Sequence, residues 1–361
     1  MNDPTTKKRN PQILWWGRSN LNYSRNRIIR QHLKSLGYNL TDFRPKISRF
    51  AGLEATLRDL CRPDCIWVPC FCHKDMPGAA LWARKNALPV VFDPLISAYD
   101  KQVYERKKYS PESHKAKKLL RWEQKLFQAA DLVIADTEEH AAFFHGTFIG
   151  DQRKPAVVPV GAEERLFYPQ RTNLPQAPFT VLFYGSFLSL QGPQTIVEAA
   201  QHYRGPKILW KMVGEGPLLE TCQKMAAGNR EIQFIPWLPY KELPDIIRSA
   251  DLLLGIFGAS AKAGRVIPNK VYQALACGKP LVTRKAPAYP PGFTENTDLG
   301  IRWVEPANPR QLAAVIAELV STPEVLPAMA SQAYNTYKGF FSTTEIQKRL
   351  GRAVGSLQKT R

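Results

Sequence analysis

The chain has 361 residues, of which 44% are hydrophobic and 22% charged. This composition is typical of a folded globular protein and excludes a mainly disordered one. The chain carries 50 Lys and Arg against 31 Asp and Glu, a net charge of +19, which indicates an anionic partner: nucleic acid, a phosphorylated substrate or a membrane surface.

The length predicts two domains of comparable size. No apolar run approaches the roughly 18 residues of a membrane span, and the first residues, MNDPTTKKRNPQ, lack the apolar region of a secretory signal. Six cysteines are too few for a disulfide scaffold, so a reducing cytoplasm is the expected compartment.

In the first half, short apolar runs alternate with amphipathic stretches, a pattern that predicts a parallel sheet covered by helices on both faces. Gly17 follows the first predicted strand and is expected to face a ligand cleft. The predicted strands are Ile13–Trp16, Tyr38–Phe43, Cys65–Val68, Pro89–Asp93 and Leu132–Ala135, and the predicted helices are Arg25–Leu36, Gly78–Asn86 and His114–Ala129.

Residues 168–179, YPQRTNLPQAPF, contain three prolines and predict a linker. The alternation of strands and helices then restarts. The predicted strands are Thr180–Tyr184, Ile208–Val213, Ile232–Ile235, Leu252–Ile256 and Pro280–Thr283, and the predicted helices are Gln194–His202, Pro217–Ala227, Tyr240–Ser249, Pro268–Cys277 and Pro309–Leu319.

The predicted fold is α/β, with two doubly wound, Rossmann-like parallel-sheet domains that face each other across a cleft. Residues 1–167 form the N-terminal domain and residues 180–343 the C-terminal one. Residues 344–361 are expected to form a helix that packs back on the N-terminal domain. In such sheets, ligands bind beyond the carboxyl ends of the strands.

The region Leu252–Thr283 is the most informative for chemistry. Its strand runs into a small-residue loop, Gly258–Gly264, and then into a helix that begins near Pro268. The N–H groups of a helix N-terminus at a strand-end cleft favour an anion. Arg265 and Lys270 flank this point, although exposed basic residues beside an ordinary turn would give the same pattern.

Two further loops follow predicted strands. The first contains Gly185, Ser186 and Gln191, whose small or polar side chains suit the close approach of a phosphate or sugar. The second contains Gly214. It is not a dinucleotide fingerprint, because Leu219 stands where the third glycine would be.

The second half contains, in this order, the segments VLFYGSFLSLQGPQTIVEAA, WKMVGEGPLLE, IQFIPWLPYKELPDIIRSADLLL and PNKVYQALACGKPLVT, and the first half contains AADLVIADTEEHAAFF and VVPVGAEERLFYP. These segments resemble the GT-B glycosyltransferases of the group 1 (family 4) type. The resemblance extends from about residue 13 to residue 341.

The resemblance implies transfer of a sugar from a nucleotide diphosphate donor that is held mainly by the C-terminal domain. The family usually has Arg and Lys where this chain has Ser186 and Gln191, and two Glu where it has Arg265 and Gln273. We expect the cationic role to have moved to Arg265 and Lys270, beside Asn269.

Gln273 keeps a carbonyl acceptor for the ribose. Trp237 and Leu238 match the stretch that holds the base, where Trp237 is expected either to stack on the base or to pack in the core.

Glycosyl transfer requires stabilisation of the departing diphosphate. The resemblance implies a retaining reaction without an essential metal, and no cofactor is expected. The candidate catalytic carboxylates are Asp93, Asp100 and Asp136, of which Asp93 and Asp136 end predicted strands, and His73 is a weaker rival. An Asp in such a position also serves as a helix or turn cap.

A metal site is not expected. Cys61, Cys65, Cys70 and Cys72 precede His73, but their spacing fits no zinc-binding cysteine pair. Free cysteines of this kind are often part of the core.

The remaining cations concentrate in two stretches, Arg18–Arg49 with eight basic residues against one acidic, and Lys101–Lys125 with nine against three. They are expected to face a glycan or lipid-linked acceptor, or an anionic membrane on whose inner face the protein is peripheral. The residues proposed for this role are Arg25, Arg27, Arg30, Lys107 and Lys108, with Trp15, Trp16, Tyr23 and Phe50 reaching the interface.

Two alternatives to a transferase are compatible with parts of the sequence. The departures from the family pattern favour a non-catalytic nucleotide- or sugar-binding relative. A nucleic-acid binder rests on charge alone and is not expected, because no nucleic-acid-binding module is present.

Overall fold

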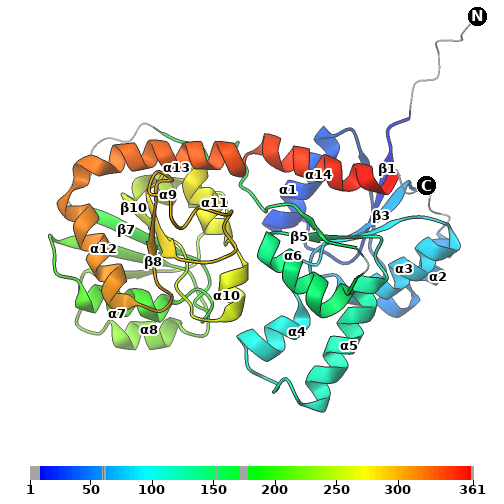
Figure 1. The fold of residues 1–361 in the computed structure, drawn as a ribbon, viewed down its shortest axis with the longest axis horizontal. Coiled ribbons are helices and arrows are strands. Elements are labelled where there is room, and N and C mark those ends of the chain that lie inside the picture. The colour runs from blue at the N-terminus through cyan, green and yellow to red at the C-terminus, as the bar shows by residue number, and fades with distance from the viewer. Residues whose placement is uncertain (1–8, 59, 61, 152, 171–177, 359–361) are drawn as a thin grey trace, which may run out of the picture. The chain divides into compact units, whose positions relative to one another are not determined.

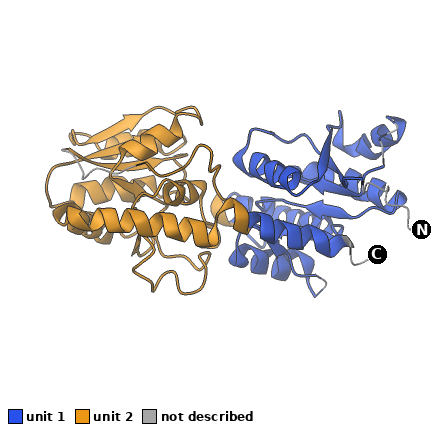
Figure 2. Ribbon diagram, turned by 90° about the horizontal axis from the view of Figure 1, so that it is seen from above, with its two compact units in different colours: residues 1–103, 107–159, 346–361 blue, residues 104–106, 160–345 orange. Residues whose placement is uncertain are grey.

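A computed structural model describes residues 9–58, 60, 62–151, 153–170 and 178–358 (Figure 1). The chain divides into two compact units (Figure 2): residues 1–103, 107–159 and 346–361, and residues 104–106 and 160–345. Each unit contains one six-stranded sheet, with the strand orders β2-β1-β3-β4-β5-β6 and β12-β11-β10-β7-β8-β9. Neighbouring strands are parallel throughout, so the predicted α/β class is confirmed.

The first unit follows a strand-helix alternation. Its elements are β1 (Gln12–Trp16), α1 (Ser24–Ser35), β2 (Asn39–Phe43), η1 (Ser48–Phe50), α2 (Ala51–Leu57), β3 (Cys65–Val68), η2 (His73–Asp75), α3 (Met76–Lys85), β4 (Val90–Phe92), α4 (Ala98–Asp100), η3 (Lys101–Glu105), α5 (His114–Gln128), β5 (Leu132–Ala135), α6 (Glu138–Phe144), η4 (His145–Ile149) and β6 (Ala156–Val157).

The second unit repeats the alternation. Its elements are β7 (Phe179–Tyr184), α7 (Pro193–His202), β8 (Ile208–Val213), α8 (Leu219–Met225), β9 (Ile232–Ile235), α9 (Leu243–Ser249), β10 (Leu252–Leu254), α10 (Ala261–Arg265), α11 (Asn269–Ala276), β11 (Leu281–Arg284), β12 (Ile301–Val304), α12 (Pro309–Ser321), η5 (Pro323–Val325) and α13 (Leu326–Phe340).

Strand β1 shows why the first sheet is buried on both faces. Successive side chains of a strand point to opposite faces. Leu14 and Trp16 belong to one apolar cluster, whereas Ile13 and Trp15 belong to a second one. Each face of the sheet therefore has its own core, and Trp15 and Trp16 are at most 1% exposed. The prediction that these two tryptophans reach a membrane interface is wrong.

The last helix, α14 (Thr343–Gln358), begins in the second unit and lies in the first from Ile346 onward (red in Figure 1). Ile346, Leu350, Val354 and Leu357 recur every three or four residues and join the same buried cluster as Ile29 and Leu33 of α1. Of the predicted linker 168–179, residues 171–177 lie outside the described residues; the two compact units change over at residues 159 and 160.

Several predicted boundaries differ in the second unit, and two of the differences have a clear local cause. Helix α9 begins at Leu243 rather than Tyr240 and has Pro244 in its first turn, where the missing N–H of proline removes no helical hydrogen bond. The loop predicted at Gly258–Gly264 contains the short helix α10, because the Ser260 side chain accepts a hydrogen bond from the Ala263 amide.

Among the described residues, no single helix has both the length and the apolar character needed to cross a membrane. One pair, bent by 85° between Pro309–Ser321 and Pro323–Leu357, meets these criteria on length and composition alone.

Candidate functional site

The loops that follow β7, β8 and β10 pack backbone against backbone. A Cβ on Gly214, whose φ is +135°, would lie 2.0 Å from the Gly185 carbonyl oxygen, and one on Gly258 would lie 2.3 Å from that of Ser189. Only glycine fits such a close approach. The predicted residues Gly185 and Gly214 are therefore neighbours, at the carboxyl ends of β7 and β8.

Lys270 lies in the first turn of α11 and reaches this loop cluster from within. The side chain is buried, and Nζ lies 3.6 Å from the centroid of the Phe183 ring. In the described part of the chain, Nζ has no hydrogen-bond partner. Burial lowers the pKa of Lys270 well below its ordinary value. An ammonium group in this position favours an anion that would accept its hydrogen bonds.

The side chains of Gln191 and Lys270 both lie close to Gly185. A Cβ on Gly185 would lie 3.2 Å from Lys270 Nζ and 3.7 Å from Gln191 Oε1. Oε1 is buried and has no hydrogen-bond partner within the described ranges, while Ser186 is half-buried in the same loop. The structure thus brings together Lys270 and the 185–191 loop, which are far apart in the sequence.

Gln273 lies one turn further along α11 and is buried. Its Oε1 accepts a 2.8 Å hydrogen bond from the Tyr184 hydroxyl. Burial raises the pKa of Tyr184 well above its ordinary value, so the phenol stays a donor. A carbonyl oxygen has two lone pairs, and the second one remains for the predicted ribose contact.

The remaining predicted donor residues lie at or just beyond the ends of α10, α11 and β9. Arg265 ends α10 and Asn269 begins α11, both half-buried. Trp237, after β9, is 54% exposed and Leu238 is half-buried. The exposure of Trp237 contradicts the alternative that it packs in the core. The described structure therefore leaves its indole accessible to a partner.

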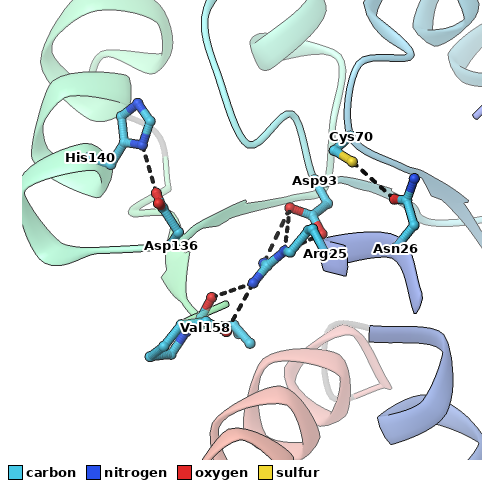
Figure 3. Close-up of polar contacts among 8 residues, drawn as sticks. Arg25, Asn26, Cys70, Asp93, Asp136, His140 and Val158 are labelled. Carbon is cyan, nitrogen blue, oxygen red and sulfur yellow. Dashed lines mark hydrogen bonds and ion pairs between the residues drawn. The ribbon is translucent and has the colours of Figure 1, made fainter. Parts of the chain in front are cut away.

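In the first unit, a buried ion pair joins α1 to the end of β4 (Figure 3). Arg25 Nε lies 3.0 Å from Asp93 Oδ2 and Nη2 lies 3.2 Å from Oδ1. Nη1 donates to the Val158 and Pro159 carbonyl oxygens at 2.7 and 3.0 Å. Both side chains are essentially unexposed. Arg25 therefore ties three chain segments together at the carboxyl edge of the sheet.

Arg25 does not contribute to a basic surface, and that prediction is wrong. The helical spacing of Arg27, Arg30 and Lys34 predicts one basic face for these three residues. Arg25 is not part of that face, because its side chain points toward the sheet. Burial opposes the charge of Arg25, but the Asp93 carboxylate outweighs it and raises the pKa of Arg25. Burial also raises the pKa of Asp93, against the effect of Arg25.

Asp136 follows β5 and forms a pair with His140 on α6. Asp136 Oδ1 lies 2.6 Å from His140 Nδ1 (Figure 3). Thr137 caps α6 by accepting a hydrogen bond from the His140 amide. His140 is fully buried, and in the described part of the protein its Nε2 has no hydrogen-bond partner. Sequence reasoning singled out Asp136 but missed His140, although the i, i+4 spacing was a readable signal.

Asp100 and Gly17 are two further predicted site residues of the first unit. Asp100 is fully buried at the end of α4, where its amide donates to Ser97 Oγ at 3.0 Å. Gly17 has φ +144°, and a Cβ there would lie 2.7 Å from Cys72 Sγ. Gly17 is thus a close-packing position against the turn after β3.

The turn after β3 also contains a residue that sequence reasoning missed. Phe71 has φ +65° and a side chain 48% exposed, and its ring lies 4.9 Å, edge-on, from that of Tyr23. A left-handed conformation is uncommon for an aromatic residue, and such strain is concentrated at binding sites. The sequence does not show that Phe71 is unusual, because the left-handed conformation is visible only in the backbone dihedral angles.

His73 is buried, with Nε2 2.9 Å from the Ile96 carbonyl oxygen and 3.4 Å from Glu123 Oε1. Cys61 lies outside the described residues. Among those described, no group of three or more His, Cys, Asp or Glu side chains is arranged to hold a metal ion. His73 packs against Phe92 and Trp122 instead.

Lowering the pH through the range from 6.5 to 4 is expected to destabilise the protein through His73. Burial lowers the pKa of His73 to about 4 from 6.5, so the unfolded chain binds a proton that the folded protein does not. This contribution is about 2–3 kcal/mol. Urea unfolding across this range would measure it. His73→Gln should flatten the profile relative to wild type, and parallel profiles would contradict the prediction.

Of the predicted surface cations, Arg27 is half-buried and Lys107 and Lys108 are exposed. Arg30 lies 5.0 Å from the centroid of the Trp15 ring and donates to both carboxylate oxygens of Asp42. The basic surface is therefore discontinuous around α1.

Comparison with known proteins gives consistent matches. Residues 164–336 match the family model described as Glycosyl transferases group 1. The putative colanic acid biosynthesis glycosyl transferase WcaI of Escherichia coli (strain K12) is 30% identical over 155 residues, 42% of this chain and 38% of that protein. D-inositol 3-phosphate glycosyltransferase of Segniliparus rotundus is 27% identical over 224 residues, 57% and 48% of the two chains.

The chain thus spans less than half the length of these curated relatives. Among solved structures, Anabaena HepE in complex with UDP and glucose superposes with a TM-score of 0.71 at 15% identity, covering 96% of this chain and 100% of that one. This likeness concerns the fold. The narrower family 4 assignment stays a prediction.

Proposed function

Because the chain has the GT-B fold and its residues 164–336 match the family model of the group 1 glycosyl transferases, we propose that it is a glycosyltransferase. It would move a sugar, a hexose or a related one, from a nucleotide diphosphate-sugar to a glycan or lipid-linked acceptor. The observation that carries the proposal is the buried Lys270 ammonium beside Gly185 and Gln191, without a hydrogen-bond partner among the described residues.

The donor diphosphate would lie against the loops after β7 and β8. Lys270 would supply positive charge to the leaving diphosphate, with Arg265 beside it, in place of the Arg and Lys usual at positions 186 and 191. Gln273 would accept from the ribose, and Trp237 would stack on the base. HepE binds UDP in its solved complex, which supports UDP as the first nucleotide to test.

On the acceptor side, we propose Asp136 as the carboxylate that orients or deprotonates the acceptor. Asp93 is held by Arg25 through both oxygens and Asp100 is fully buried, so we assign these two a positioning role. Asp136 is held by His140 through one oxygen only. We further propose that the reaction is retaining and needs neither metal nor cofactor.

Turnover would be tested on a panel of UDP-, GDP- and ADP-sugars, with and without EDTA, by release of the nucleotide diphosphate. The Arg265→Ala/Lys270→Ala variant is expected to lose at least about 10²-fold in rate, and Asp136→Asn about 10²–10⁴-fold. Full activity of the double variant would contradict the proposed diphosphate site. Binding of UDP without turnover of any donor would favour a non-catalytic relative, in keeping with the family residues that this chain lacks.

A further inference from the structure

Four large apolar side chains are exposed along η1 and α2 of the first unit, and we name them the apolar stripe. Ile47, Phe50, Leu53 and Leu57 are 55%, 55%, 62% and 78% exposed. They recur every three or four residues. At about 100° per residue, Phe50, Leu53 and Leu57 fall within about 60° of one another around the helix axis.

The opposite side of α2 attaches the helix to the unit. Ala51 and Ala55 are fully buried and belong to the core cluster of the first sheet. Small residues let α2 lie close to α3, where Gly52 and Gly78 adjoin. The apolar stripe is therefore the outward face of a fixed helix, and it is not a loosely packed part of the core.

Positive charge surrounds the apolar stripe. Arg44, Lys46 and Arg49 are exposed, and within the described ranges none of them forms an ion pair with a carboxylate. Glu54 is the single acidic residue of segment 44–58, and its charge is matched by Arg58 at 2.6 Å. The segment therefore carries three cations without a counter-charge around an apolar face.

We propose that η1 and α2 dock the protein on an anionic membrane surface. The apolar stripe would enter the boundary between lipid head groups and acyl chains, and Arg44, Lys46 and Arg49 would contact lipid phosphates. A helix that combines exposed Phe and Leu with unmatched Arg and Lys has the chemistry of an interfacial element. A protein partner would match the apolar face but leaves the uniform sign of the charge unexplained. This docking surface is separate from the donor site and from the proposed reaction.

Flotation of the full chain with vesicles tests the proposal. Vesicles of phosphatidylcholine and phosphatidylglycerol should carry the protein, whereas pure phosphatidylcholine should carry much less. Leu53→Ser/Leu57→Ser should reduce the bound fraction at least about tenfold, and Leu53→Phe/Leu57→Phe should retain it. Since all these positions are exposed, an unchanged Tm would show that the variants fold.

A charge control separates this surface from the net charge of the chain. Arg44→Gln/Lys46→Gln/Arg49→Gln should weaken binding to anionic vesicles. Lys115→Gln/Lys117→Gln/Lys118→Gln removes the same number of exposed cations from α5 and should have a much smaller effect. Equal losses in the two triple variants, or undiminished binding of the serine variant, would overturn the proposal. Self-association that depends on the apolar stripe, without vesicle binding, would also overturn it and identify a protein interface.

Discussion

Replacing Lys270 by methionine is expected to stabilise the ligand-free protein and to weaken binding of UDP. The ammonium is buried and lies against the Phe183 ring, and among the described residues it has no hydrogen-bond partner. Methionine would keep the packing on the ring without the desolvation cost. We expect a gain of about 1–3 kcal/mol in the free energy of unfolding, or several degrees in Tm.

The same substitution removes the charge that the diphosphate would meet. Charge-assisted hydrogen bonds contribute about 1.5–3 kcal/mol, so affinity for UDP should fall by about 10- to 100-fold. Differential scanning calorimetry and isothermal titration would measure the two effects. Lys241→Met, at an exposed position, is the matched control and should change neither. Weaker UDP binding without any stabilisation would show that Lys270 is not strained in the empty protein.

The stabilising effect of Lys270→Met should depend on pH in a defined direction. The pKa of Lys270 is lowered by burial from 10.5, so below that value the unfolded chain binds a proton that the folded protein binds less readily. The destabilisation by Lys270 is complete below the folded-state pKa and disappears as the pH rises through 10.5. The advantage of methionine should therefore grow as the pH falls from 10.5 and level off below the folded-state pKa of Lys270. At a pH above the folded-state pKa of Lys270, binding of UDP to wild type should be accompanied by proton uptake, visible as a binding enthalpy that depends on the buffer.

Replacing Asp93 by asparagine is expected to cost about 3–5 kcal/mol of stability. The substitution leaves the Arg25 guanidinium charged, fully buried and without its counter-ion. Urea unfolding would measure the loss. The Arg25→Met/Asp93→Leu variant removes both charges and should recover much of it, because burial of an intact ion pair adds little net stability over apolar packing.

Asp42→Asn provides the control for Asp93→Asn. Asp42 pairs with Arg30 in the same unit, also through both carboxylate oxygens, but the Asp42 side chain is 36% exposed. Water then offsets most of the interaction, and we expect a loss below about 1 kcal/mol. Equal losses for the two variants would contradict the assignment of Asp93 to the support of the sheet edge.

In the donor region, the sequence predicts where the loops lie but not which side chains are buried. The small-residue loops at Gly185, Gly214 and Gly258 follow apolar strands, so their place at the carboxyl edge of a parallel sheet follows from the pattern. The sequence also indicates that Lys270 lies near a helix N-terminus. It contains no sign that Lys270 is buried under Gly185, because burial depends on a contact between residues 85 positions apart.

The acceptor side was predicted less well for the same reason. Periodicity places Arg27 and Arg30 on one helix face, but the partner of Arg25 comes from β4, and two more of its acceptors come from residues 158 and 159. The sequence of η1 and α2 shows a phenylalanine and two leucines, which would equally suit a core helix. Their exposure follows from how α2 lies on the sheet.

By itself, the sequence determined most of the strands and helices and the α/β class, because alternation and turn residues act over a few neighbouring positions. The same is true of the glycine loops and of the family resemblance that they carry. Tertiary structure alone decided which charges are buried and which apolar side chains are not. Desolvation and ion pairing depend on groups from distant parts of the chain, and a local pattern does not specify those neighbours.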